Sequence, residues 1–460
     1  MKRILLQYHI WEREYIILEI LRKRLENFGM VVEYADYMDI NGCIKFRPDV
    51  IITHPIRTET DVIFLATMKL ATGAVMIPMT VEGYYDLEDH KSVIRMIGLD
   101  KCPVNLIDYF IMWGEKNKEI EGRELLNLQK ISSVDKIKAF GYIPYEKEAV
   151  LEYVKHDEQY AKYVQWGKKY ARIIACVTGF HIAEASMEDI YLQKIIGSSV
   201  GSKAYEREAH DYEMRIAYMK GYRDKYVNDI LQLAKTFPDM GIVVKLHPAE
   251  ISRMRRGISD YYEVLRDYDN IFLLDVPLPI AAVLNDAELL IHYGSTVSLE
   301  AYIYGKPTIL RSAKGYIDEN SNNILVYTTK VDINDYSLFQ EEVINGVTFQ
   351  KNNKAETILL DSFNWRPDMR YCPSEEMAKF ISGDLHSEKL QIKELISQKF
   401  VSDDFVRSVR IMIYKYIIKT LIQFKFGQTS IYLRYAVNLM SGANTFWNDL
   451  IRTIKKRRHF

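Results

Sequence analysis

The sequence has no uninterrupted apolar run of about 18 residues, so it predicts no transmembrane helix. Its four cysteines show no C-x-x-C spacing, which argues against a zinc site or a disulfide framework and favours a reducing cytoplasm. The formal net charge is only −1, which leaves no overall field to attract nucleic acid or a membrane. The apolar run Ile4–Gln7 ends at Tyr8-His9, so it predicts a first strand and not a secretion signal.

The composition is that of a soluble globular protein, with 48% apolar and 27% charged residues, and 460 residues allow two or three domains. In the first third of the chain, short apolar runs alternate with helical periodicity. The helix predicted over Glu12–Phe28 is followed by Gly29 as a stop signal. Further strands are predicted at Met30–Tyr34, Asp49–Thr53, Ala74–Ile77, Ile107–Trp113 and Lys138–Phe140. This alternation predicts a parallel sheet in a first domain over residues 1–165.

A polar helical linker is expected at Tyr145–Lys169, after which the pattern restarts in a second domain over residues 166–385. A long helix is predicted at Ala209–Phe237, whereas residues 320–384 show no clear pattern. Strands are predicted at Arg172–Val177, Ile242–Leu246, Ile271–Leu274, Leu289–His292 and Thr308–Leu310. Residues 386–460 are expected to form a helical extension. The fold class is therefore α/β, with two Rossmann-like parallel-sheet domains facing a cleft and a helical tail.

Two stretches of the second domain carry most of the chemistry, Val243–Glu250 and Leu290–Ala301. Each is an apolar strand that stops in a polar turn. A third predicted strand ends similarly, in Thr178-Gly179. Ligands of open α/β sheets lie beyond the carboxyl ends of strands and at the N-termini of the following helices. These turns therefore predict a site for an anionic leaving group, most simply a nucleotide phosphate.

In the first of these turns, the imidazole of His247 can donate to a phosphate oxygen or, when protonated, neutralise a leaving phosphate. Pro248 fixes the backbone and removes a competing donor. Lys245 lies on the opposite sheet face from Leu246, so it is either a phosphate ligand or a surface residue. A histidine that merely bonds its own loop is the alternative for His247.

In the second turn, Ser295 and Thr296 supply hydroxyl and backbone N–H groups at a helix start, where the helix dipole favours anions. The same residues could serve simply as a helix N-cap, and both roles can hold together. Gly294 permits close approach of the backbone to a ligand. Glu300 lies one helical turn after Thr296, on the same face.

The two-domain pattern with a helical tail is the GT-B architecture of glycosyltransferases. The His247-Pro248 and Ser295-Thr296 pairs resemble the HP and S-S/T motifs of bacterial sialyltransferases, polysialyltransferases and capsule Kdo transferases. The whole chain resembles bacterial surface-carbohydrate biosynthesis proteins of that superfamily. The resemblance implies that Glu300 binds the ribose hydroxyls of the donor nucleotide. It also implies that helix ends and side chains stabilise the leaving phosphate, so no metal and no cofactor is expected.

The catalytic base is expected in the first domain, within Met79–Tyr84, directly after a predicted strand. This stretch is similar to the acidic-acidic-Gly motif of bacterial sialyltransferases, whose acidic residue takes the proton from the acceptor hydroxyl. Glu82 precedes Gly83, but Val81 occupies the other acidic position. The alternative is a loop or N-cap acid. Other groups that could act near this cleft are Asp86, Glu88, Asp89, His90, His9 and His54.

One formal metal motif, Asp267-Tyr268-Asp269, precedes a predicted strand instead of following one, which disfavours a Mn²⁺ site. The chain ends in the basic stretch Ile451–Phe460. Such an end can attract an anionic membrane, at about 1 kcal/mol per basic residue, or can remain solvated while the tail packs on the first domain. The expected location is the cytoplasm, with contact to the inner face of the bacterial membrane as an open alternative.

Together these features predict an inverting, metal-independent glycosyltransferase of capsule or lipopolysaccharide synthesis. By resemblance, its donor is a CMP-activated acidic sugar, such as Kdo, sialic acid or another nonulosonate, and its acceptor is a glycan or lipid-linked glycan. Nucleic acid is not an expected partner. Three alternatives remain open: a CDP-glycerol-type polyol-phosphate transferase, a UDP-sugar 2-epimerase, and an inactive nucleotide-binding scaffold of a capsule assembly complex.

Overall fold

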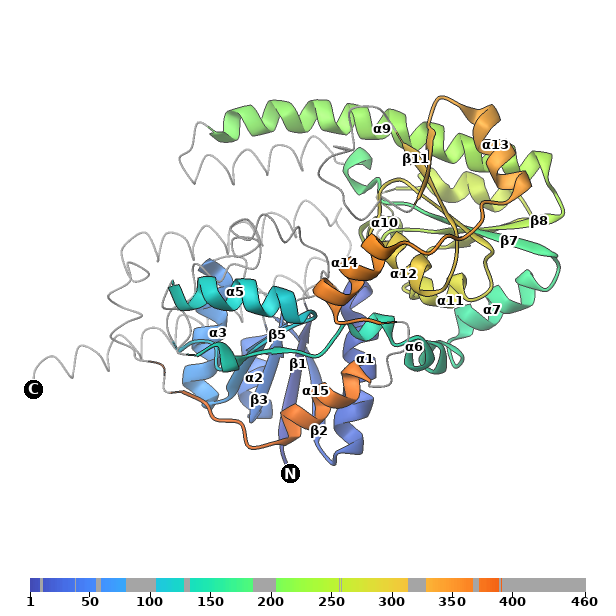
Figure 1. Ribbon diagram of the computed structural model, residues 1–460. Coiled ribbons are helices and arrows are strands. Elements are labelled where there is room, and N and C mark those ends of the chain that lie inside the picture. The colour runs from blue at the N-terminus through green and yellow to red at the C-terminus, as the bar shows by residue number, and fades with distance from the viewer. Residues whose placement is uncertain are drawn as a thin grey trace, which may run out of the picture.

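The structure is a computed structural model. It describes residues 1–8, 11–37, 39–54, 59–79, 105–127, 133–184, 204–255, 257, 259–312, 328–366, 372–388 and 390. Figure 1 shows two α/β domains, the first in blue to teal and the second in green to orange, as the sequence predicts. The helices expected in residues 391–460 and the segment carrying Glu82 lie outside the described residues.

The first domain has a parallel sheet in the order β2-β1-β3-β4. Its strands are β1 (Arg3–Tyr8), β2 (Val31–Asp36), β3 (Val50–Thr53) and β4 (Val75–Pro78). A parallel pair, β5 (Phe110–Met112) and β6 (Ile137–Ala139), joins it through a bridge between Met79 and Ile111. Its helices are α1 (Trp11–Asn27), α2 (Ile40–Phe46), α3 (Glu59–Thr72) and α5 (Glu115–Asn127). The strands predicted from the sequence are confirmed to within a few residues.

The second domain has a parallel sheet of six strands in the order β12-β11-β10-β7-β8-β9. The strands are β7 (Arg172–Val177), β8 (Met240–Lys245), β9 (Ile271–Leu274), β10 (Leu289–His292), β11 (Thr308–Ser312) and β12 (Thr329–Asp332). Helices α9 (Ala204–Thr236), α10 (Pro248–Arg255), α11 (Ile280–Leu284), α12 (Val297–Ile303) and α13 (Tyr336–Asn345) connect or cover them. The order reverses between β7 and β10, so the topological switch point lies there.

The central strands of this sheet are apolar on both faces because each face is covered. Val177 and Val243 belong to the core that extends toward the first domain, whereas Cys176 and Val244 belong to the core under α9. Val177 is in register with Lys245, and Cys176 with Ile291. Side chains in register on neighbouring strands point to the same face. This register fixes which polar residues emerge together at the carboxyl edge.

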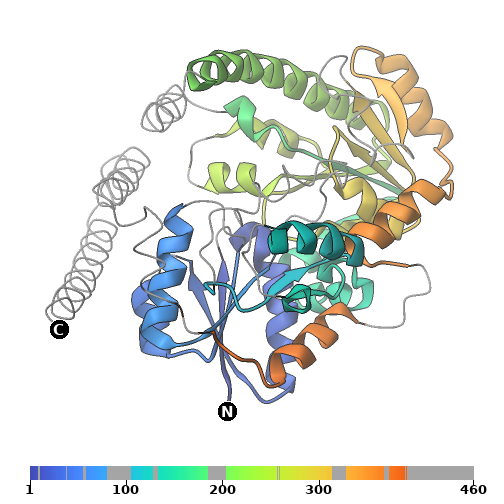
Figure 2. The same cartoon turned by 60° about the vertical axis from the view of Figure 1, so that its left-hand side comes forward.

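The chain crosses between the domains more than once. The expected linker forms α6 (Lys147–Val154) and α7 (Glu158–Gly167), with Asp157 as the N-cap of α7. After the second sheet, α14 (Asn353–Phe363) packs on α5, and α15 (Pro373–Ser382) packs on α1 of the first domain (Figures 1 and 2). The ammonium of Lys2 donates to the carbonyl of Ile381 at 3.0 Å near the end of α15. The boundary predicted at residue 385 thus lies after the chain has already returned to the first domain.

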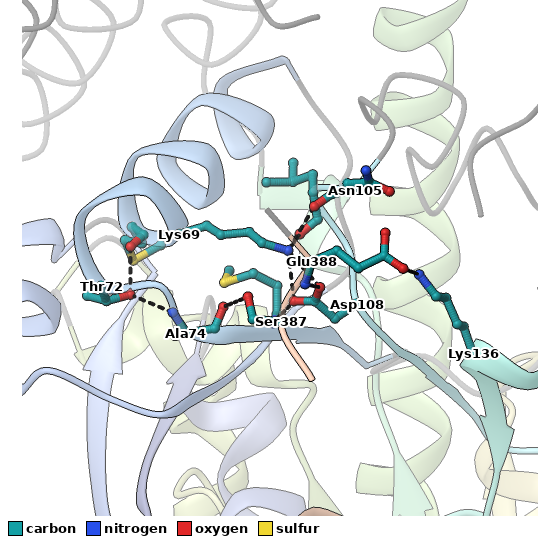
Figure 3. A network of polar contacts seen from close by, with 11 residues as sticks. Lys69, Thr72, Ala74, Asn105, Asp108, Lys136, Ser387 and Glu388 are labelled. Atoms are coloured by element: carbon teal, nitrogen blue, oxygen red, sulfur yellow. Dashed lines mark hydrogen bonds and ion pairs between the residues drawn. The ribbon is translucent and has the colours of Figure 1, made fainter. Parts of the chain in front are cut away.

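A buried network anchors the segment after α15 to the first domain (Figure 3). Lys69 and Asp108 form an ion pair at 2.8 Å with both side chains almost fully buried. Asp108 also accepts from the backbone N–H of Met76 at 2.8 Å and of Glu388 at 2.7 Å. The Ser387 hydroxyl donates to the Ala74 carbonyl at 3.1 Å. Detaching the segment after α15 would take the Glu388 N–H away from the buried Asp108 carboxylate. The loss of a donor to a buried charge is unfavourable, so the network stabilises the docked position of this segment.

Among the helices that the structure describes, none is both long enough and apolar enough to cross a membrane.

Candidate active site at the switch point of the second domain

Three neighbouring strands end side by side at the candidate site. β7 lies between β8 and β10, and adjacent strands are about 4.8 Å apart. The predicted stretches Thr178-Gly179, Lys245–Glu250 and Gly294–Glu300 therefore leave the same edge of one sheet, on both sides of the switch point. Ligands of open α/β sheets bind beyond the carboxyl ends of the strands, so the three stretches lie where a ligand is expected.

The His-Pro turn is a helix N-cap built from its own sequence. The carbonyl of His247 accepts from the N–H groups of Glu250 and Ile251 at 2.9 and 3.0 Å, and Pro248 is the first residue of α10. Nδ1 of His247 accepts from the N–H of Ala249 at 3.2 Å. The carboxylate of Glu250 accepts in turn from the His247 N–H at 3.0 Å, which completes a reciprocal capping arrangement. The spacing His-Pro-x-Glu thus follows from the need to satisfy the first donors of a helix.

Glu250 is a site residue that the sequence analysis quoted but gave no role. It is fully buried and accepts from the Phe180 N–H at 2.8 Å and from the Tyr262 hydroxyl at 2.6 Å. The Thr178 hydroxyl also donates to it. Burial raises the pKa of Glu250, and these hydrogen bonds oppose the rise. The carboxylate therefore joins the turn after β7 to the turn after β8.

His247 is a partly exposed, neutral hydrogen-bond donor in the free protein. Burial is the main cause that lowers the pKa of its imidazole, to about 3, followed by the neighbouring His181, Lys245 and Arg13. Because Nδ1 accepts a backbone hydrogen bond, the network assigns the ring proton to Nε2. Arg13 comes from α1 of the first domain, so a charge of the first domain also acts on His247. The one sequence signal for Arg13 is its position at a helix start after the first strand.

His181 is a further residue that sequence reasoning passed over. It lies in a short 3-10 turn, His181–Glu184, after β7. Its ring stacks on that of His247 with centroids 4.9 Å apart and planes inclined by 19°. The two imidazoles thus come from the ends of neighbouring strands.

Lys245 and Glu300 connect the two motifs electrostatically. Lys245 emerges on the same face as Val177, as the alternation with Leu246 predicts. Burial raises the pKa of Glu300 to about 7, and the charge of Lys245 opposes this rise. Burial lowers the pKa of Lys245, while Glu300 and then Glu250 oppose that shift. The predicted lysine and the predicted ribose ligand therefore share one environment, although they lie far apart in the sequence.

The Gly-Ser-Thr turn is shaped by His292, which the sequence analysis treated only as a strand end. Nδ1 of this buried histidine accepts from the N–H groups of Gly294 and Ser295 at 3.2 and 3.3 Å. Gly294 has φ +117°, a conformation that favours glycine. The hydroxyl of Ser295 accepts from the Val297 N–H at 3.3 Å. The His292 imidazole thus accepts the backbone hydrogen bonds of this turn, a role that an Asn or Asp side chain commonly fills.

Thr296 is the N-cap residue of α12, but its side chain makes no capping hydrogen bond and is exposed. The capping alternative therefore applies to the hydroxyl of Ser295, while that of Thr296 is presented to solvent. Because α12 has only seven residues, its dipole is short, and the side chains around the turn must supply most of the attraction for an anion.

Gly179 is required by close packing at the switch point. A Cβ at this position would lie 1.5 Å from the Tyr293 hydroxyl. The Tyr293 ring in turn packs on Phe180 with centroids 4.8 Å apart. The first residue after β10 thus lies directly against the turn after β7, so any larger residue at 179 would displace the tyrosine.

Most of the residues proposed for catalysis in the first domain cannot be placed by the structure. Glu82, Asp86, Glu88, Asp89, His90 and His9 lie outside the described residues. His54 is buried, packs edge-to-face on Tyr37 at 4.7 Å, and its Nδ1 lies 3.3 Å from the Thr53 hydroxyl. These contacts are those of a core histidine.

The formal D-x-D motif is engaged in structural contacts. The carbonyl of Asp269 accepts from Trp166 Nε1 at 2.9 Å and from the Tyr170 hydroxyl at 2.7 Å. Within the described part of the chain, no three His, Cys, Asp or Glu side chains gather to hold a metal ion. Whether the protein works without a metal or cofactor stays a prediction.

Comparison with known proteins gives similarity to solved structures only. No family model matches the chain, and no curated protein matches it. The Methanocaldococcus jannaschii UDP-GlcNAc 2-epimerase in complex with UDP-GlcNAc and UDP is similar at 13% identity, with 83% of this chain and 99% of that chain covered and a TM-score of 0.48. The S. aureus MnaA-UDP structure gives 14% identity, 83% and 96% coverage, and a TM-score of 0.44.

The wall teichoic acid polymerase TagF is similar at 12% identity, with 83% of this chain and 87% of that chain covered and a TM-score of 0.45. All three TM-scores lie below 0.5. The assignment of two Rossmann-like domains in a GT-B arrangement therefore rests on the sheet orders, the parallel registers and the return of α15 to the first domain.

Proposed function

We propose that this chain is a nucleotide-dependent transferase of bacterial surface-polysaccharide synthesis, with its donor nucleotide bound at the switch point of the second domain. The observation that carries the proposal is the shared environment of Lys245 and His247, at the end of β8, and Glu300, in the helix after β10, on the two sides of β7. A cation, a neutral N–H donor and a carboxylate in one site match a phosphate beside a ribose.

In the proposed reaction, the acceptor hydroxyl attacks the anomeric carbon of the donor sugar as the bond from that carbon to the phosphate oxygen breaks. The electron pair of the broken bond stays on the phosphate. Lys245 and the Nε2–H of His247 stabilise its charge, together with the hydroxyls of Ser295 and Thr296. Glu300 accepts hydrogen bonds from the ribose. Glu82 takes the proton of the acceptor hydroxyl, and direct attack inverts the anomeric configuration.

The finer identity of the donor follows the sequence resemblance. We expect a CMP-activated acidic sugar, Kdo, sialic acid or another nonulosonate, and a glycan or lipid-linked glycan acceptor. Activated nucleotides are available in the cytoplasm, which is the proposed location. Contact of the basic end at residues 451–460 with the inner membrane face remains a prediction, because that end lies outside the described residues.

A thermal-shift panel with CMP, CDP, UDP and GDP tests the donor assignment. A ligand at about 100 times its Kd stabilises the fold by about 2.7 kcal/mol, a readily visible shift. CMP should stabilise the wild-type protein, and Glu300→Gln should reduce that shift. Stabilisation by UDP alone would overturn the nonulosonate donor and favour the epimerase alternative. Stabilisation by CDP alone would favour the polyol-phosphate transferase.

Glu82→Gln tests the catalytic base. It should abolish transfer while nucleotide affinity stays nearly intact, because the base contacts the acceptor and not the nucleotide. Unchanged transfer would refute the role of Glu82. Wild-type protein that binds nucleotide but transfers nothing to any glycan would support the scaffold alternative.

A further inference from the structure

Of the stacked pair His181 and His247, only His247 contacts the phosphate in the reaction proposed above, so His181 has no role assigned there. The rings are nearly parallel, with an inclination of 19° and centroids 4.9 Å apart. They reach this position from separate turns, since His181 follows β7 and His247 follows β8. The stack therefore holds these turns together, as Glu250 also does through Thr178 and Phe180.

The orientation of the His247 ring is defined on two sides. One edge is fixed by the hydrogen bond from the Ala249 N–H to Nδ1 at 3.2 Å. One face is covered by His181. A single hydrogen bond to Nδ1 still allows the His247 ring to rotate about that bond. A stacked neighbouring ring restricts this rotation. The Nε2–H edge is then held in one direction.

The charged groups that act on His247 come from several elements. Lys245 on β8 and Arg13 on α1 are cationic, and His181 also disfavours a second positive charge. The carboxylate of Glu250 on α10 is occupied by four donors, including the His247 N–H. His247 is thus kept neutral by its neighbours and by burial until an anion enters the site.

Resting on the proposed function, we propose that His181 is a positioning residue: its ring, stacked on His247, holds the His247 imidazole so that Nε2–H is directed at the bound phosphate. The stack needs a flat ring and not an acid or a base at position 181. Phe should therefore replace His181 in this role, whereas Ala should not.

Three variants test this role in the full-length protein. His181→Ala removes the stack, His181→Phe keeps a flat ring, and His156→Ala changes a largely exposed histidine elsewhere as the matched control. CMP affinity is measured by titration calorimetry, with inorganic pyrophosphate as a second probe that carries no base. We expect His181→Ala to weaken binding about tenfold, comparable to one hydrogen bond to a charged group. His181→Phe should recover most of this loss, and the control should bind as the wild type does.

A second measurement does not depend on any ligand. The ring signals of His247 are followed by NMR on histidine-labelled protein and assigned with His247→Gln. Because His181 contributes to the low pKa of His247, both His181→Ala and His181→Phe should raise that pKa, while His156→Ala leaves it unchanged. If neither His181 variant alters the His247 titration, the stack does not exist in solution and the inference is overturned.

The two measurements separate this inference from the proposed function. If the wild-type protein binds none of the nucleotides but the His247 titration shifts in both variants, the stack stands and the proposed function fails. If the wild type binds CMP, and His181→Ala binds it equally well, the positioning role fails while the proposed function survives.

Discussion

Glu250→Gln should loosen the candidate site by removing one charge without changing the shape of the side chain. Each oxygen of the Glu250 carboxylate serves one backbone N–H and one hydroxyl. A glutamine must place its NH₂ group against one of those pairs. A hydroxyl can rotate to accept a hydrogen bond, but a backbone N–H cannot.

The structure indicates which pair meets the amide nitrogen. The N–H of His247 has a second acceptor in the Thr178 hydroxyl at 3.1 Å. Phe180 N has no second acceptor among the described residues. The amide nitrogen should therefore face His247, and the amide oxygen should keep Phe180. Hydrogen bonds to a charged acceptor contribute more than neutral ones, so the expected loss in the free energy of unfolding is about 1–3 kcal/mol.

Urea unfolding followed by circular dichroism measures this loss, with Glu263→Gln as the control. Glu263 is exposed and pairs with Arg266 at 2.9 Å, so its change should cost less than about 1 kcal/mol. CMP affinity should also fall in Glu250→Gln, because the turns that hold Thr178 and His247 lose a common partner. Equal unfolding midpoints for the two variants would refute the role given to Glu250.

Two further changes test the site and its packing. Glu300 has a pKa near 7, above that of an unfolded glutamate, so the folded state holds an extra proton and the free energy of unfolding should fall as pH rises through this range. Glu300→Gln should remove at most about 3 kcal/mol of this pH dependence between about pH 5 and about pH 8, and an unchanged slope would contradict the burial of this carboxyl. Gly179→Ala should lower both thermal stability and nucleotide affinity, because its Cβ would meet a tyrosine hydroxyl. Gly221→Ala, at a helix position with open space, should instead stabilise by up to about 1 kcal/mol, and equal effects would argue against the close packing at 179.

The sheet edges of the fold were predictable because they depend on local signals. Buried parallel strands are continuous apolar runs, and the polar turns after them stand out. Gly305 with Pro307 marks the end of α12, and Gly305 has φ +65°. The sequence also placed Lys245 on the correct face by alternation with its neighbour.

The contacts that support the site residues were harder to predict from the sequence. The spacing of His247 and Glu250 is a capping signature that could have been read from the sequence. The stack with His181 and the approach of Arg13 depend on the sheet order and on the domain arrangement, which no short spacing encodes. The helices of residues 336–382 were missed because each spans only about three turns, although Asn352 caps one of them.

The return of the chain to its starting domain has a consequence for dissecting the protein. Residues 1–165 contain every strand of the first sheet, yet α1 is covered by α15, and Asp108 is completed by the backbone of Glu388. A fragment cut at 165 would expose an apolar helix face and leave a carboxylate with fewer donors. Separate production of the first domain would therefore require grafting residues 372–390 back onto it by a short linker.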